Sequence, residues 1–162
     1  MFKRNKLGKK STFEDAIQHY LEGNIRDSAL EFAAWSKANG LAPKQDGDPA
    51  EWLIPYKDDC LCWIHFEPKY HFRFFYCDYS GEQDEGFMRA VQDHVMHCTT
   101  CHEGPCSGGD AVIFGKAFTN VCKEFTVRFE NPDGGTMEHI KQLLAYWKEK
   151  GHTSVSYHYH NG

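Results

Sequence analysis

The sequence predicts an α+β fold with two layers, in which an antiparallel β-meander sheet packs against helices. Apolar residues recur at helical spacing towards both ends of the chain and alternate at every second position in its middle. The alternating segments are joined by short turns that cannot hold crossover helices, which favours antiparallel pairing. The 162 residues are predicted to form a single domain.

Composition limits the classes of function. Apolar residues make up 41% and aromatic residues 15% of the chain, so we expect a ring-rich core rather than disorder. The net charge of −5 argues against a general nucleic-acid binder. Residues 1–10 form a basic arm and residues 151–162 a polar tail, and both are predicted to be flexible.

The first helix is predicted to begin with a capping box, in which Ser11 caps the backbone and Glu14 reaches back to it. Gly23 is predicted to end this helix. Its apolar stripe consists of Phe13, Ala16, Ile17, Tyr20 and Leu21.

A second helix is predicted from Arg26 or Asp27 to Lys37, with Gly40 closing it. Residues 42–50 contain two prolines and a glycine and are predicted to form a loop.

The middle of the chain predicts three consecutive strands, Trp52–Lys57, Cys60–Glu67 and Tyr70–Tyr79. The third strand separates two sets of side chains: Tyr70, Phe72, Phe74 and Tyr76 on one face, and His71, Arg73, Phe75 and Cys77 on the other. We group Trp63 with the aromatic set. This face is expected to form either a ligand groove or the core that the helices cover.

The second half predicts a helix, two strands and a final helix. The helix carries the stripe Phe87, Met88, Val91 and Val95. The strands are predicted at Ala111–Phe114 and Cys122–Glu130, and the last helix runs from about Gly135 to Lys150.

Four cysteines at the spacing C-x2-C-x4-C-x15-C predict a structural zinc site. They are Cys98, Cys101, Cys106 and Cys122. Four thiolates close a tetrahedral Zn²⁺ site, and a zinc ion would order a glycine-rich loop that has little core of its own. The nearby His94, His97 and His102 are possible substitutes for one thiolate.

Other chemistry can use the same cysteines. Cys98 and Cys101 form a redox C-x-x-C motif, but the pair follows a predicted helix end, where the helix dipole does not lower a thiol pKa. An iron–sulfur cluster takes four thiolates as well. With His102 the motif also matches haem c attachment, which two further cysteines at metal-ligand spacing disfavour.

Two other groups have chemically active side chains. Cys60, Cys62 and Cys77 lie in apolar strand patterns and are expected to be buried without a ligand. His65 and His71 are expected to face each other across a turn, and a pocket that they line with Arg73 is one interpretation. Polar cross-strand pairs on a solvated face are the simpler interpretation of the histidines.

Three motifs of the second half occur together. They are the C-x2-C-x4-C run, the run FGK-x-F-x-N-x-C that ends at Cys122, and Asn131-Pro132-Asp133 before the last helix. This part of the chain resembles an uncharacterised family of small cysteine-containing bacterial proteins. The whole chain is more distantly similar to the YdhG-like α+β fold. The resemblance implies the fold and the cysteine set, and brings no established activity.

These observations favour a cytoplasmic, zinc-containing domain that binds a small molecule or a protein partner. Neither a transmembrane stretch nor the apolar segment of a signal peptide is visible, and an odd number of cysteines, seven, suits reduced thiols. The alternative is a thiol- or metal-dependent enzyme that uses Cys98 or Cys101. Salt-sensitive binding of nucleic acid by Lys3–Lys10 is a further hypothesis.

Overall fold

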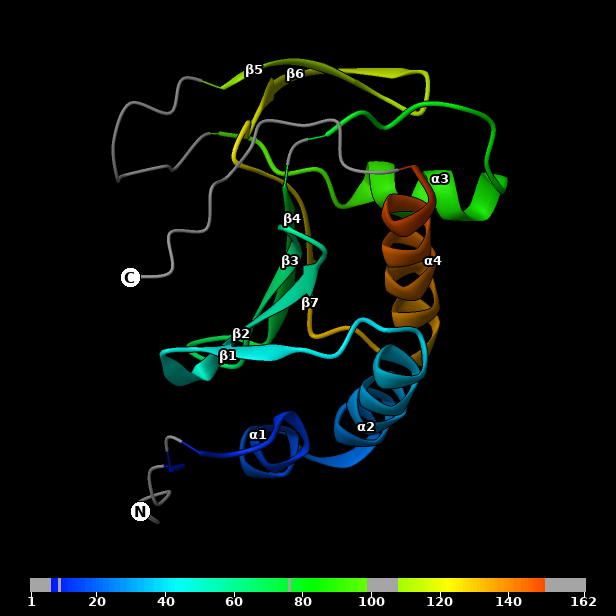
Figure 1. The fold of residues 1–162 in the computed structure, drawn as a ribbon. Helices are drawn as coiled ribbons and strands as arrows, with labels where there is room; N and C mark the ends of the chain where they lie inside the picture. Colours follow the sequence, from blue (N-terminus) through cyan, green and yellow to red (C-terminus); the bar gives the residue numbers. More distant parts are fainter. Residues whose placement is uncertain (1–6, 9, 76, 99–107, 151–162) are drawn as a thin grey trace.

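A computed structural model describes residues 7, 8, 10–75, 77–98 and 108–150. Most of the predicted basic arm, the polar tail, Cys101, His102 and Cys106 lie outside the described residues. The described part contains four helices, a five-stranded sheet and a two-stranded sheet (Figure 1). The predicted two-layer α+β class is confirmed.

The larger sheet is entirely antiparallel and has the strand order β1-β2-β3-β4-β7. Its strands are β1 (Lys44–Asp46), β2 (Asp48–Tyr56), β3 (Asp59–His65), β4 (His71–Phe75) and β7 (Phe125–Glu130). Strands β2, β3 and β4 form the predicted three-stranded meander, β1 extends it at one edge, and β7 joins β4 from a distant part of the chain. The smaller sheet is a hairpin of β5 (Gly109–Ile113) and β6 (Lys116–Val121).

The helices are α1 (Phe13–Tyr20), α2 (Gly23–Ala38), α3 (Glu85–Asp93) and α4 (Gly134–Lys150). The helices that pack on the five-stranded sheet all lie on one side of it (Figure 1). The ring of Phe32 in α2 contacts Phe72 at 5.2 Å between centroids, and Phe13 in α1 contacts Trp52 at 5.3 Å. This helix-facing side of the sheet is therefore the core, and the aromatic set that contains Phe72 and Phe74 is covered rather than open.

The start of α1 lies one residue later than predicted. Thr12 is the N-cap: its Oγ1 accepts from the Asp15 backbone N–H at 3.1 Å, and the Asp15 carboxylate accepts from the Thr12 N–H at 3.0 Å. Ser11 instead donates to the Gly8 carbonyl. Glu14 forms an ion pair with Lys37 and so connects α1 to α2.

The predicted start of α2 was three or four residues too late, because Gly23 begins that helix instead of only ending the first. Gly23 has φ +61°, a conformation that glycine adopts at little cost and that turns the chain between the two helices. At the other end, Gly40 has φ +70° and the Leu41 N–H donates to the Ser36 carbonyl at 2.7 Å, which confirms the predicted closure.

The predicted loop at 42–50 is wrong, since it contains β1 and the start of β2. β1 is a polar edge strand of three residues and shows no apolar alternation that sequence reasoning can detect. Strand β6 was also missed. Conversely, β4 stops at Phe75 and β7 begins only at Phe125, so Cys122 lies in the connection between β6 and β7 rather than in a strand.

Candidate functional site

Two places bring together the chemically active side chains of this chain. The first is the segment after α3, which contains Cys98. Val95 and His97 form isolated antiparallel bridges to Val127 in β7 and to Val121 in β6. The segment therefore joins the five-stranded sheet to the hairpin.

Backbone hydrogen bonds place Cys98 and Cys122 on neighbouring chain segments. The Cys98 N–H donates to the Asn120 carbonyl and the Cys122 N–H to the Met96 carbonyl, each at 2.8 Å. In such a ladder the two cysteines are diagonal neighbours on the same face, with Cα atoms about 7–8 Å apart. The structure thus brings together the two predicted thiols that it describes.

The chain returns to this place at Gly108. A Cβ atom on Gly108 would lie 2.8 Å from Cys98 Cβ and 2.3 Å from Asn120 Oδ1, so only glycine fits here without a shift. The Cys122 sulfur accepts from the Phe125 N–H at 3.4 Å. Cys101, His102 and Cys106 lie outside the described residues, and within the described residues no three potential ligands form a metal-binding group.

The two described histidines near the thiols have defined partners. His94 Nδ1 donates to the Ala90 carbonyl at 2.7 Å, and its ring packs on Phe129. His94 and Cys98 are four residues apart but do not share a helical face, because α3 ends at Asp93. His97 Nδ1 donates to the Thr119 carbonyl at 3.0 Å, and strand-like alternation turns His97 away from its neighbour Cys98.

The three cysteines outside this set are unsuited to thiolate chemistry. Cys62 and Cys77 are buried, as predicted, whereas Cys60 is half-buried. Burial raises the pKa of Cys60 to about 12 and raises the pKa values of Cys62 and Cys77 as well. A thiol with a raised pKa is a poor nucleophile at neutral pH.

The second place is the sheet face opposite the helix-packed core, which we call the polar face. It consists of Trp63 and His65 in β3, His71 and Arg73 in β4, and Arg128 in β7. Trp63 pairs with Arg73, which in turn pairs with Arg128, while His65 pairs with His71. Grouping Trp63 with Phe72 and Phe74 was therefore wrong.

The histidines of the polar face stack on each other and are held by defined hydrogen bonds. Their ring centroids lie 4.9 Å apart with planes inclined by 6°. Arg73 Nη2 donates to His65 Nε2 at 2.8 Å, which places the His65 proton on Nδ1. His71 Nδ1 donates to the Lys69 carbonyl at 2.7 Å, which leaves a lone pair on His71 Nε2.

Burial and the two nearby arginines keep both imidazoles neutral at pH 7. Burial, followed by the charges of Arg73 and Arg128, lowers the pKa of His65 to about 4. Burial is also the main cause that lowers the pKa of His71 to about 4, and Arg128 adds to it. His71 is only 5% exposed, so the expectation of a solvated face does not hold at its centre.

Several polar atoms of the polar face are hidden from solvent and have no hydrogen-bond partner. They are Trp63 Nε1, His71 Nε2, Arg73 Nε and Arg128 Nε. Arg128 Nε does lie 3.2 Å from Glu130 Oε1, but without the geometry of a hydrogen bond. The Arg73 guanidinium lies 4.2 Å from the centroid of the Phe125 ring, a cation–π contact that fixes its plane. Native proteins leave few buried donors unpaired, so this concentration points to a site.

Sequence reasoning found His65, His71 and Arg73 but missed Trp63 and Arg128. Apolar and polar residues alternate along β7, and this alternation predicts on which side of its own strand Arg128 lies. The pairing of β7 with β4, which brings Arg128 beside Arg73, has no local signal in the sequence.

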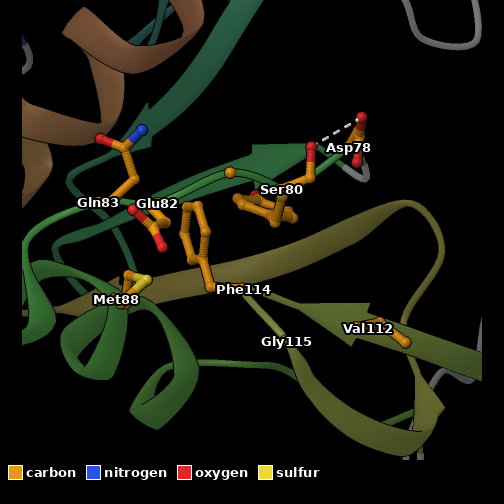
Figure 2. Close-up of a pocket in the computed structure, with 10 residues that line it drawn as sticks. Asp78, Ser80, Glu82, Gln83, Met88, Val112, Phe114 and Gly115 are labelled. Atoms are coloured by element: carbon orange, nitrogen blue, oxygen red, sulfur yellow. Dashed lines mark hydrogen bonds between the residues drawn. The ribbon is translucent and has the colours of Figure 1, made fainter.

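A third feature is a pocket of about 640 Å³ between the loop after β4 and the β5–β6 hairpin. Figure 2 shows Phe114 among the residues that line it, with Met88 of α3 and Val112 of β5 at its sides. The polar groups of Ser80 in this pocket have partners: Ser80 Oγ donates to Asp78 Oδ2 at 3.1 Å, and the Ser80 carbonyl accepts from Tyr146 Oη at 2.8 Å. None of the lining side chains has a hidden polar atom without a partner.

Comparison of the chain with protein-family models, curated proteins and solved structures finds no match. The resemblance to the small cysteine-containing family and to the YdhG-like fold therefore stays a prediction. Within the described residues, none of the helices combines the length and the apolar character needed to cross a bilayer.

Proposed function

We propose that this chain is a cytoplasmic binding module for a small molecule or a protein partner, and that a structural zinc ion holds its C-terminal half together. The observation that supports the zinc site is the backbone hydrogen bonding between residues 96–98 and 120–122, which puts Cys98 diagonally across from Cys122. Cys101 and Cys106 are the expected remaining ligands. An iron–sulfur cluster on the same thiolates is the alternative cofactor.

In this architecture a bound zinc ion would have a structural role. The β5–β6 hairpin is a separate two-stranded sheet, and such hairpins are marginally stable alone. In the described residues the ladder around His97 and Val121 is its backbone connection to the segment that follows α3. A metal ion bound by Cys98 and Cys122 would strengthen this connection.

Binding is favoured over catalysis by the state of the other thiols. Cys60, Cys62 and Cys77 have raised pKa values, which removes them as nucleophiles. The enzyme hypothesis then depends on Cys98 or Cys101 being reactive. It predicts one exchangeable metal position or one fast-reacting thiol in a stably folded protein.

Elemental analysis combined with thiol titration tests the proposal. We expect one zinc per chain and, in addition to the buried Cys62 and Cys77, about four protected thiols, in line with a closed four-thiolate site. Cys122→Ser should lose the zinc, whereas the matched control Cys60→Ser, at a half-buried thiol outside the set, should keep it. Reaction of all seven thiols in a metal-free protein would refute the zinc proposal. Bound iron and a brown colour would favour the iron–sulfur cluster instead.

A further inference from the structure

The polar face of the sheet has more hydrogen-bond donors than the protein itself uses. Trp63 Nε1 and Arg73 Nε can only donate, and both are hidden from solvent without an acceptor. Because both atoms are hidden, an external acceptor reaches them only when the side chains that cover them move aside, and it then forms a hydrogen bond with each. Such an acceptor must be compact, because the two residues are direct cross-strand neighbours with Cβ atoms about 5 Å apart.

Electric charge on this face specifies the acceptor further. Arg73 and Arg128 lie directly opposite each other on β4 and β7, and like charges in that position repel. Arg73 makes no ion pair with any carboxylate of the described residues, although Glu124 and Glu51 are near enough to affect its pKa. Arg73 therefore has a guanidinium without a direct ion-pair partner among the described residues.

Two of the surrounding carboxylates contact other side chains. Glu51 lies 3.9 Å from His65 Nδ1, on the far side of that ring from Arg73. Glu130 accepts from Lys69 Nζ at 3.0 Å and lies 3.2 Å from Arg128 Nε. Since both imidazoles are neutral, Arg73 keeps a full positive charge beside an indole N–H that has no partner.

From this arrangement we propose that the polar face is an oxyanion-binding site, which takes the carboxylate or phosphate group of a small molecule between Trp63, Arg73 and Arg128. A guanidinium matches both groups because its planar donors fit two oxygens at once. Contact with Phe125 holds the Arg73 guanidinium in place before the ligand arrives. The inference deepens the proposed binding role and rests on it, but it is independent of the zinc.

The experiment uses the full ¹⁵N-labelled chain and the indole N–H signal of Trp63, assigned by its absence in Trp63→Phe. Inorganic phosphate and citrate are titrated separately, with sodium chloride holding the ionic strength constant. We expect a saturable shift of this signal with at least one of the two anions. Phosphate alone identifies a phosphorylated ligand and citrate alone a carboxylate, and either outcome supports the site.

Variants separate the site from general charge effects. Arg73→Gln should weaken the binding of the anion by about tenfold or more, as expected for loss of a charged hydrogen bond. The affinity of Arg73→Lys should lie between that of Arg73→Gln and that of the parent chain. Arg89→Gln is the matched control, since Arg89 is exposed on α3 and pairs with Glu85; binding should not change. If Arg73→Gln does not fold, Arg73→Lys and the titration of the parent chain decide.

A shift no larger than sodium chloride produces, or equal weakening in the Arg73 and Arg89 variants, would overturn the proposal. The two proposals can fail separately. If the protein holds zinc but binds neither anion, the zinc proposal is supported and the oxyanion site is refuted. If the protein is metal-free but binds an anion saturably at Trp63, the oxyanion site is supported and the zinc proposal is refuted.

Discussion

The stacked pair of His65 and His71 predicts that the protein loses stability under mildly acidic conditions. Both imidazoles have a pKa of about 4 in the folded chain, against about 6.5 for an ordinary histidine. Between these values the unfolded chain binds protons that the folded chain does not. The free energy of unfolding therefore rises with pH across this window and falls as the pH drops from 6.5 towards 4.

The size of the effect follows from the two shifts. Solvent screens these groups little, because the His65 side chain is 12% exposed and His71 is 5% exposed. With the pKa values above, each imidazole loses about 1.2 kcal/mol between pH 7 and pH 5.5, so the pair loses about 2.5 kcal/mol. A loss of this size is a large part of the stability of an ordinary domain.

Urea unfolding at pH 7 and at pH 5.5, followed by tryptophan fluorescence, measures this loss. His71→Asn should reduce the loss by about half, whatever it does to stability at pH 7. His139→Asn, on the exposed side of α4, is the matched control and should leave the loss unchanged. The pKa values of the carboxylates Glu14, Asp15, Glu130 and Asp133 are lowered from ordinary values that already lie below pH 5.5, so these groups stay largely ionised between pH 5.5 and pH 7. Equal stability at the two pH values, or an unchanged loss in His71→Asn, would refute the reasoning.

Two further predictions concern stability at neutral pH. Thr12→Ala should cost about 1 kcal/mol in urea unfolding because it removes the cap of α1, and Ser11→Ala should cost less, because the reciprocal cap bonds belong to Thr12; the reverse order would restore the capping box first expected. Tyr146→Phe should cost about 1–3 kcal/mol, since its hydroxyl bonds to Ser80 N–H at 3.0 Å and to two backbone carbonyls, whereas Tyr56→Phe should be nearly neutral. Equal thermal shifts in the two tyrosine variants would contradict this.

The helices show what local sequence patterns can and cannot predict. Apolar periodicity was enough for α1 and α4, whose stripes face the core. The cap of α1 was placed wrongly because Ser11-x-x-Glu14 and Thr12-x-x-Asp15 both fit a capping box. Only the backbone conformation chooses between them, and Thr12 has the extended φ and ψ that a cap needs.

The sheet explains why the candidate site could be predicted only in part. Alternation along β4 correctly placed His71 and Arg73 on one face, because side chains alternate within any strand. Which face of β3 joins them depends on the register across the turn, and a slip of one residue exchanges the two faces. That register puts Trp63, rather than Cys62 or Ile64, beside Arg73, and the pairing of β4 with β7 adds Arg128 from a strand far away in the sequence. The oxyanion site needs a donor from each of three strands, so it exists only at the level of strand pairing, which no single segment of the sequence encodes.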